Sequence, residues 1–584
     1  MPAPIEDYAL LSDCRTGALV SKEGSIDWLC LPRFDAPSLF GALLGEASNG
    51  CWSLRPLDAA ATSQRHYVSD TFILVTRWET AHGIAEVQEF MPLHPSRSDV
   101  VRRIVGIEGR VEFVTELRLH FDYSRRLPWV RQVGTSEEPA LRATAGPEAV
   151  IVRGVRLIAE DHRHRATLTV SAEEVRDLTL SWFPSHEHSP KPLDIDGAIA
   201  ATRSWWQGWA SGIQHEGPYR GEVVRSLLVL RALTNKDTGG IVAAATTSLP
   251  EEFGGSRNWD YRFVWLRDAA LTLEALIAHG FLTEAHHWRR WLLRAVAGER
   301  DLLERELTSL PGYGGAAPVR IGNGAVDQYQ GDVIGEVLVA LECARIAGLE
   351  EGDFSWPLQR ALIEQVIASI DRPDNGIWEI RGEPQWFTHS RVMMWAALDR
   401  GVRAVREHGL AGDADRWATV RDSLRREIDE RGVDPVEGYF TQHYGSTEVD
   451  ASLLVLPQVG YCAPDDPRML RTVAQIERTL LTEGFVRRYR TESGVDGLEG
   501  GEHPFIACSF WLVEQYAATG RTDEARDLMS RLIDMTNDLG LLSEEYDVGQ
   551  DRQAGNTPQA LSHLTLIRAA DALAGHGGRA ANRR

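Results

Sequence analysis

The spacing of apolar residues changes once along this chain, close to residue 192, and this change limits the possible folds. Before it, short alternating runs of apolar and polar residues predict strands. From about 217 to 575 the apolar residues recur every three to four positions, which predicts helices. The 584 residues are too many for one hydrophobic core. We therefore predict a β-rich N-terminal domain followed by an all-helical domain.

Short runs of β-branched and aromatic residues, separated by turns, fill the first 190 residues or so. Many short strands at this spacing are typical of an antiparallel sandwich. The predicted strands are Gly17–Val20, Ser25–Leu31, Thr71–Trp78, Ile84–Phe90, Val100–Glu108, Val111–Phe121, Val150–Leu157, Arg165–Val170 and Leu178–Phe183. The segment Pro184–Pro192 is rich in Pro, Ser and His, as expected of a linker. A β-sandwich domain is predicted over residues 1–192.

The next segment, Ile195–Ile213, carries Ile199, Trp205, Trp206 and Trp209 on a helical pattern. We interpret residues 193–215 as a linker helix that lies against the sandwich. Twelve further helices are predicted, at 217–235, 264–280, 283–297, 327–347, 354–371, 387–408, 413–432, 449–457, 466–482, 505–519, 522–537 and 557–575.

Twelve helices in pairs suit a closed double ring, with six helices inside and six outside. No sequence repeat of fixed period is visible, which argues against a solenoid. We therefore predict an (α/α)6 barrel over residues 216–584. Loops gathered at one end of such a ring would form a pocket.

The segment Asp374–Arg381 combines a turn with an acid beside an indole. Asp374 begins the turn, and Trp378 and Glu379 follow it directly. An acid held against an indole loses hydration, which raises its pKa and lets it act as a proton donor. The simpler alternative is a loop glutamate that pairs with Arg381.

A second acidic stretch, Leu541–Asp547, contains Glu544 and Glu545 and also follows a turn, Asn537–Gly540. The two acidic stretches follow the fifth and the eleventh predicted helices, so both can reach the same end of the ring. Two loop carboxylates brought together in this way form an acid/base pair that can split a glycosidic bond.

The segment from Tyr261 to Asp268 opens the second predicted helix. A carboxylate such as Asp268 is favourable near a helix N-terminus, and Arg267 and Asp268 can also form a structural pair. The functional alternative is that Arg267 donates to sugar hydroxyls and Asp268 accepts from them, while Tyr261 and Trp265 wall the site. The residues alone do not favour either reading.

Three more polar residues are weaker candidates. Gln330 and Asp332 enter the fourth predicted helix, but their spacing does not require them to face the same way. Arg488 offers another donor, with a surface arginine as the simpler reading.

Composition excludes several classes of function. A net charge of −22 argues against nucleic acid as the partner. Neither a signal peptide nor an apolar run of about 18 residues is visible, so a cytoplasmic protein without a membrane span is expected.

The six Cys are scattered without metal spacing and are typical of reduced, mostly buried thiols. No nucleotide, zinc-protease or serine-hydrolase motif is present, so no metal and no cofactor is expected; a homo-oligomer is compatible with these features.

Several long motifs resemble those of glycoside hydrolase family 15, the glucoamylase, glucodextranase and bacterial trehalase group, and they occur in the family's order. They are Gly24-Ser-Ile-Asp-Trp-Leu-Cys-Leu-Pro-Arg-Phe-Asp35, Asn258-Trp-Asp-Tyr-Arg with Trp265-Leu-Arg-Asp, Pro318-Val-Arg-Ile-Gly-Asn, Gly376-Ile-Trp-Glu-Ile-Arg-Gly, Leu542-Ser-Glu-Glu and Gly555-Asn-Thr-Pro-Gln-Ala-Leu-Ser-His563. The resemblance covers nearly the whole chain.

The resemblance implies a β-sandwich joined by a helical linker to an (α/α)6 barrel. It also implies inverting exo-hydrolysis of α-glucosides with release of β-glucose. Glu379 takes the position of the general acid and Glu544 that of the general base. The residues that it places around the substrate are Tyr261, Trp265, Arg267, Asp268, Gln330, Asp332, Trp378, Arg488 and Glu545.

The sequence departs from the family pattern at Gly331, Ile334, His389 and Arg391, which puts the substrate rather than the reaction in question. We expect trehalose or a short α-gluco-oligosaccharide, because a cytoplasmic enzyme meets small substrates. The alternatives are activity on longer α-glucans, a glycoside phosphorylase, and a carbohydrate-binding protein without turnover. The presence of both acids disfavours the last two.

Overall fold

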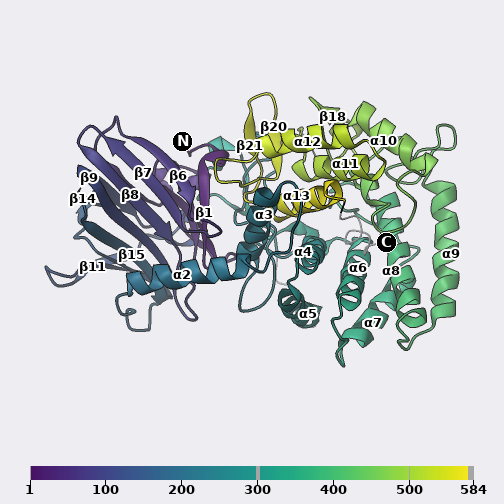
Figure 1. Ribbon diagram of the computed structural model, residues 1–584, viewed down its shortest axis with the longest axis horizontal. Coiled ribbons are helices and arrows are strands. Elements are labelled where there is room, and N and C mark those ends of the chain that lie inside the picture. The colour runs from purple at the N-terminus through teal and green to yellow at the C-terminus, as the bar shows by residue number, and fades with distance from the viewer. Residues whose placement is uncertain (1, 297–302, 499, 576–584) are drawn as a thin grey trace.

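The computed structural model describes residues 2–296, 303–498 and 500–575. Figure 1 shows a strand-rich N-terminal part beside a helical C-terminal part, with helix α2 (Ile195–Ala210) running along the strands towards the helices. The predicted fold class is confirmed. Among the described residues, no helix combines the length and apolar character needed to cross a membrane. All six Cys are free thiols, and five of them are buried.

The N-terminal strands pair antiparallel in two layers that share one long strand. They are β1 (Tyr8–Ser12), β2 (Gly17–Ser21), β3 (Ser25–Cys30), β4 (Ser38–Phe40), β5 (Cys51–Pro56), β6 (Thr62–Tyr67), β7 (Leu74–Thr80), β8 (Gly83–Phe90), β9 (Ser98–Arg118), β10 (Trp129–Gly134), β11 (Pro139–Ala145), β12 (Glu148–Arg153), β13 (Ile158–Glu160), β14 (Arg163–Ser171) and β15 (Val175–Pro184).

Strand β9 joins the two layers. Its first half pairs with β8 and β15, and its second half pairs with β5 and β14. The sequence predicted two strands here, and the structure has one. Gly109 lies where the strand changes layers, with a φ of 62°, and a Cβ at this position would lie 2.3 Å from the carbonyl oxygen of His82. Glycine therefore permits the crossover.

The helices of the C-terminal part match the predicted positions closely. They are α3 (Arg220–Leu233), α4 (Leu266–Ala278), α5 (Leu282–Val296), α6 (Val333–Ile346), α7 (Ser355–Ala368), α8 (Thr388–Arg406), α9 (Ala414–Arg431), α10 (Pro467–Thr479), α11 (Ile506–Ala518), α12 (Thr522–Asp534) and α13 (Ala560–Leu573). The helix predicted at 449–457 is a short 3-10 segment, η6 (Ala451–Val455). Residue 297, the predicted end of another helix, lies outside the described residues.

The helices form a double ring. Segments α4, α6, α8, η6, α11 and α13 contact one another in this order, and α13 packs against α4 to close the inner ring. The outer helices α3, α5, α7, α9, α10 and α12 each pack on an inner partner. Loops that lead from an outer to an inner helix therefore lie at the N-terminal ends of the inner helices. Both acidic stretches are in such loops, as predicted.

Helix α2 lies against the sheet, as the sequence predicted. Ile195 and Ile199 pack on a buried cluster that includes Phe90. The ring of Trp206 meets the ring of Phe72 edge-on, with centroids 5.0 Å apart.

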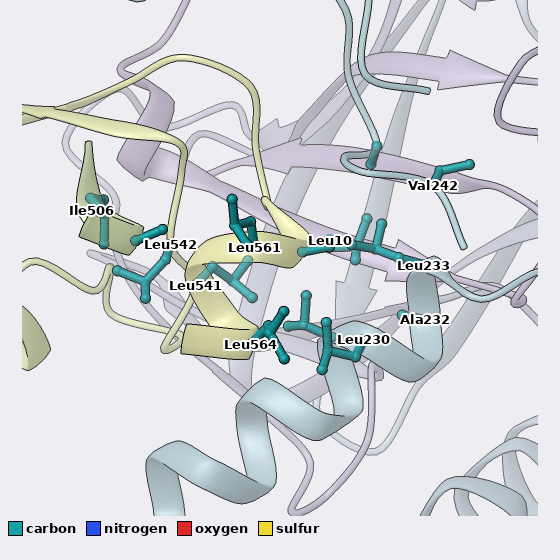
Figure 2. Close-up of a cluster of buried hydrophobic side chains, with 14 of the residues drawn as sticks. Leu10, Leu230, Ala232, Leu233, Val242, Ile506, Leu541, Leu542, Leu561 and Leu564 are labelled. Carbon is teal, nitrogen blue, oxygen red and sulfur yellow. The ribbon is translucent and has the colours of Figure 1, made fainter. Parts of the chain in front are cut away.

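The two parts of the chain share one hydrophobic core (Figure 2). Leu10 of β1, Leu230 of α3 and Leu561 of α13 belong to this core. Leu541 and Leu542, the first two residues of the second acidic stretch, join the same cluster. The sheet therefore anchors the segment that carries Glu544.

Small hairpins complete the helical part. They pair β16 (Arg305–Leu307) with β17 (Val319–Ile321), β18 (Leu481–Thr482) with β19 (Phe485–Val486), and β20 (Glu545–Asp547) with β21 (Arg552–Ala554).

A buried arginine in the loop before α4 joins this loop to the N-terminal part of the chain. Arg262 is 1% exposed and pairs with Asp260 at 2.7 Å, and it also donates to the hydroxyl of Tyr123 at 3.0 Å and to the carbonyl of Ala36 at 3.1 Å. Removing one member of such a pair leaves the other charged and buried, at a cost of about 3–5 kcal/mol.

We expect Arg262→Ala to lower the free energy of unfolding by about 3–5 kcal/mol, measured by urea unfolding followed by tryptophan fluorescence. The control is Arg33→Ala, which removes an exposed partner of Asp35 and should cost less than about 1 kcal/mol. Equal stabilities for the two variants would contradict the structural role given to Arg262.

Candidate active site

The loop between α7 and α8 holds Glu379 in an uncommon backbone conformation. Asp374 Oδ2 accepts hydrogen bonds from the N–H groups of Gly331 at 2.8 Å and Gly376 at 3.2 Å. Gln328 Nε2 donates to the carbonyl of Glu379 at 3.1 Å. The φ of Glu379 is +56°, a value that is costly for a residue with a side chain and is concentrated at functional sites.

The carboxyl group of Glu379 faces an indole and a guanidinium. Trp265 Nε1 donates to Glu379 Oε1, and Arg267 Nη2 lies 3.5 Å from the same oxygen. Burial raises the pKa of Glu379, and Arg267 and Trp265 offset part of that rise. Arg381, the partner in the simpler alternative, instead pairs with Glu304 at 3.1 Å. Glu379 therefore has the environment of a carboxyl group that holds its proton at higher pH than usual.

Glu544 is fully buried in the loop between α12 and α13. Its Oε1 accepts a 2.6 Å hydrogen bond from the hydroxyl of Tyr261, and its Oε2 accepts one from the Asn556 N–H at 3.3 Å. Burial and the charge of Glu251 raise the pKa of Glu544 to about 8. A Cβ on Gly555 would lie 2.6 Å from the Cβ of Glu544, so glycine at 555 makes room for this side chain.

Two neighbouring aromatic residues connect the two carboxyl groups. Tyr261 binds Glu544, Trp265 binds Glu379, and the rings of Tyr261 and Trp265 have centroids 5.2 Å apart. The structure therefore brings the two predicted acids to the same end of the ring, although 165 residues separate them in sequence.

Arg488 lies among three buried glutamates. It donates to Glu251 at 2.7 Å, forms two hydrogen bonds to Glu502, and lies 3.4 Å from Glu545 Oε1. Glu545 Oε2 accepts from the N–H of His503 at 3.0 Å. Burial, reinforced by the charge of Glu251, raises the pKa of Glu545 well above its usual range. Glu545 thus contacts Arg488 rather than the cavity.

A deep cavity with about 770 Å³ of empty space, partly open to solvent, lies at this end of the ring. The predicted residues that line it are Tyr261, Trp265, Arg267, Asp268, Trp378, Glu379 and Arg488. Gln458 and Arg568, which sequence reasoning missed, line it as well, and Arg568 donates to Gln458 at 2.7 Å.

A smaller outer cavity, with about 410 Å³ of empty space, shares Tyr261, Trp378, Glu379 and Arg488 with the deep one. Its other polar lining residues include Glu251, Arg257, Asn323, Arg381 and Asp496. Glu379 therefore lies at the junction of two adjoining cavities. Glu544 lines neither of them and lies behind Tyr261.

The remaining predicted residues are placed as follows. Asp332 is fully buried and pairs with Arg267 Nη1 at 3.2 Å, so it supports a wall of the cavity. Gln330 is half-buried and is not among the residues that line either cavity. Trp378 Nε1 donates to Asp450 Oδ2 at 2.8 Å, which fixes the indole beside Glu379.

Comparison with known proteins decides the family. Residues 217–571 match the family model described as glycosyl hydrolases family 15. The chain belongs to glycoside hydrolase family 15. Residues 1–182 of this family 15 enzyme match a model described as trehalase-like, N-terminal.

Curated relatives of this glycoside hydrolase match over almost its full length. A trehalase of Mycobacterium tuberculosis is 36% identical, covering 97% of this chain and 89% of the relative. A trehalase of Thermoplasma acidophilum is 34% identical, covering 95% of this chain and 98% of the relative.

A solved bacterial glucoamylase in complex with acarbose shares the fold of this family 15 chain. Its TM-score is 0.73 at 13% sequence identity, with 98% of this chain and 94% of that chain covered. The predicted family, fold class and enzyme class are thus confirmed.

Proposed function

We propose that this family 15 hydrolase cleaves trehalose into two glucose molecules with inversion at the attacked carbon. The position of Glu379 at the junction of two adjoining cavities carries the proposal, because a disaccharide that fills both cavities has its glycosidic oxygen at that junction. The trehalase relatives support the choice of substrate. The catalytic domain is proposed as residues 216–584, with 193–215 as linker and 1–192 as the sandwich domain.

In this proposal the terminal glucose occupies the deep cavity, where Arg267 and Asp268 offer donors and acceptors to its hydroxyls. Glu379 gives its proton to the glycosidic oxygen as the bond to the anomeric carbon breaks. A water on the opposite face of the sugar attacks that carbon and passes a proton to Glu544. An inverting pair needs its carboxyl groups about 6.5–9.5 Å apart to hold this water.

Two more groups act by positioning. Tyr261 binds Glu544 and also lines both cavities, so its hydroxyl marks the path along which the attacking water reaches the base. Glu545 and Glu502 hold the guanidinium of Arg488 at the wall shared by the cavities. Glu545 is therefore proposed to support substrate binding rather than proton transfer.

A substrate panel tests the proposal. We expect kcat/KM for trehalose to exceed that for maltose, isomaltose and soluble starch by at least about 10-fold. A ratio of this size corresponds to the free energy of about one well-placed hydrogen bond. Glucose should be the product with or without phosphate. Faster release of glucose from maltose or starch would instead favour a glucoamylase, and glucose 1-phosphate would indicate a phosphorylase. Binding without turnover would contradict the enzymatic role.

Glu251 provides a prediction for the dependence of activity on pH. The acidic limb of kcat/KM reports the pKa of the base in the free enzyme. Burial and Glu251 together raise the pKa of Glu544, so the limb should lie above the range of an ordinary glutamate. Glu251→Gln removes a like charge, lowers the pKa of Glu544 and should move the acidic limb to lower pH.

The control is Glu252→Gln. Glu252 accepts from the N–H of Gly501 at 3.0 Å and is not among the causes of the shift at Glu544. The acidic limb of the Glu252→Gln variant should match that of the wild type. If the acidic limb of Glu251→Gln matched that of the wild type, Glu251 would not act on the pKa of the base, and the prediction would be contradicted.

A further inference from the structure

A second polar cluster lies at the other ends of the helices that lead away from the active site. His279 follows the last residue of α4, and Asp571 lies in the last turn of α13. His215 comes from the segment between α2 and α3. His215 Nδ1 lies 3.2 Å from Asp571 Oδ1, and His279 Nε2 lies 3.2 Å from Asp571 Oδ2. All three side chains are buried.

Backbone carbonyls fix the tautomers of both histidines. His279 Nδ1 lies 2.8 Å from the carbonyl oxygen of Gln214, and His215 Nε2 lies 3.2 Å from that of Pro218. A carbonyl only accepts, so these nitrogens carry the N–H groups. In the neutral rings, the lone pairs therefore lie on the two nitrogens that face Asp571. Metal-binding histidines are oriented in this way.

The contact between His279 Nε2 and Asp571 needs a cation. His279 is 2% exposed, and its Nε2 makes no hydrogen bond with the described residues although the Asp571 oxygen is 3.2 Å away. A lone pair that faces a carboxylate is repelled, unless a proton or a metal ion lies between them. Charge-assisted N–H···O bonds measure about 2.7–2.9 Å. Two ligand atoms of one tetrahedral zinc, each about 2.1 Å from the ion, lie about 3.4 Å apart.

The surrounding backbone also favours a cation. The C-terminal ends of α4 and α13 meet here, and each carries partial negative charge. A carboxylate such as Asp571 is unfavourable at a helix C-terminus unless a positive charge offsets it. Arg220 lines a cavity that adjoins the cluster. Its side chain is exposed and donates to the carbonyl of His215 at 2.9 Å.

Room for further ligands is present. The adjoining cavity has about 1120 Å³ of empty space, partly open to solvent, and is lined by the three cluster residues together with Gln214 and Glu216. The three ligand atoms lie within 4.8 Å of one another, so one ion can reach all of them. Water or Glu216 can supply a fourth ligand.

We propose that His215, His279 and Asp571 bind one divalent transition-metal ion, with Zn²⁺ as the best match. Two imidazoles and one carboxylate are the ligands that zinc accepts, whereas magnesium and calcium prefer oxygen ligands only. The bound ion would tie the segment after the linker helix to α4 and α13, two neighbours in the inner ring. Its role is structural, because its ligands lie at the helix ends away from Glu379 and Glu544.

The test uses the full chain, freed of metal by dialysis against a chelator and then titrated with Zn²⁺. We expect one Zn²⁺ per chain and a higher Tm on binding. His279→Ala and Asp571→Asn should each weaken binding at least 10-fold. Asp571→Asn keeps the shape of the side chain, so it serves if His279→Ala fails to fold. The control removes His286 and His287, both exposed on α5, and should bind like the wild type.

Co²⁺ provides a second measurement, because tetrahedral coordination by protein ligands gives visible absorption far stronger than that of hydrated Co²⁺. The spectrum should appear in the wild type and in the His286/His287 control, and vanish in Asp571→Asn. A wild type that takes up no Zn²⁺ would overturn the proposal. Equal uptake by the wild type and Asp571→Asn would overturn it as well.

Discussion

Replacing Glu379 with glutamine should lower kcat on trehalose by about 10²–10⁴-fold while the protein stays folded. Glutamine preserves the shape of the side chain and can still accept the hydrogen bond from Trp265, but it has no proton to give to the leaving oxygen. Steady-state glucose release and the circular dichroism spectrum of the variant measure the two parts of this expectation.

A second substrate distinguishes the loss of a proton donor from general damage to the active site. Fluoride leaves with little need of protonation, so Glu379→Gln should retain most of its activity on α-glucosyl fluoride. The matched control is Glu383→Gln, an exposed acid in the same loop, which should behave as the wild type on both substrates. Wild-type turnover of trehalose by Glu379→Gln would remove the proposed acid from the mechanism.

Replacing Glu544 with glutamine should also lower kcat on trehalose by about 10²–10⁴-fold, but here α-glucosyl fluoride should be affected as strongly. Water attacks the anomeric carbon in both reactions, so both need the base. The amide oxygen of glutamine can accept the hydrogen bond from the Asn556 N–H, and its NH2 group can donate to the Tyr261 hydroxyl, which limits the change in structure. Rates on the two substrates, compared with those of Glu379→Gln, separate the roles of the two acids.

Asp534→Asn, an exposed acid at the end of α12, is the control for this loop and should leave both rates unchanged. If Glu544→Gln spared trehalose hydrolysis, the base would have to be another acid. Glu251, which lines the outer cavity, would be the next candidate.

The sequence predicted those parts of the site that follow from local chemistry. The turn before Trp378 predicted an acid held against the Trp378 indole, whereas the indole that donates to the Glu379 carboxyl group is that of Trp265. Counting helices predicted that Glu544 lies at the same end of the ring. The structure adds the link between them, because the hydroxyl of Tyr261 and the indole of Trp265 reach one acid each.

Residues whose role depends on distant partners could not be predicted. Glu251 and Glu502 lie in loops far from Arg488 or on its other side in sequence, and only the fold brings them to it. Arg568 lies on a helix, where an arginine usually faces solvent, yet it lines the deep cavity. Gln330 and Asp332 looked equivalent in sequence, and the start of α6 places only Asp332 against Arg267.

The same limit applies to the fold. The sequence predicted two strands in place of β9, because the apolar pattern breaks at the exposed segment where β9 changes layers. Strands β6 and β10 are mostly exposed, so they lack the alternation that reveals a half-buried strand.

The anomeric form of the first glucose released tests the central claim, that Glu379 and Glu544 act from opposite faces of one sugar. Both anomeric carbons of trehalose have the α configuration, and only one is attacked. Proton NMR in the first minutes, before mutarotation, should therefore show α- and β-glucose in equal amounts. Early formation of α-glucose alone would mean retention, and would contradict the roles given to the two acids.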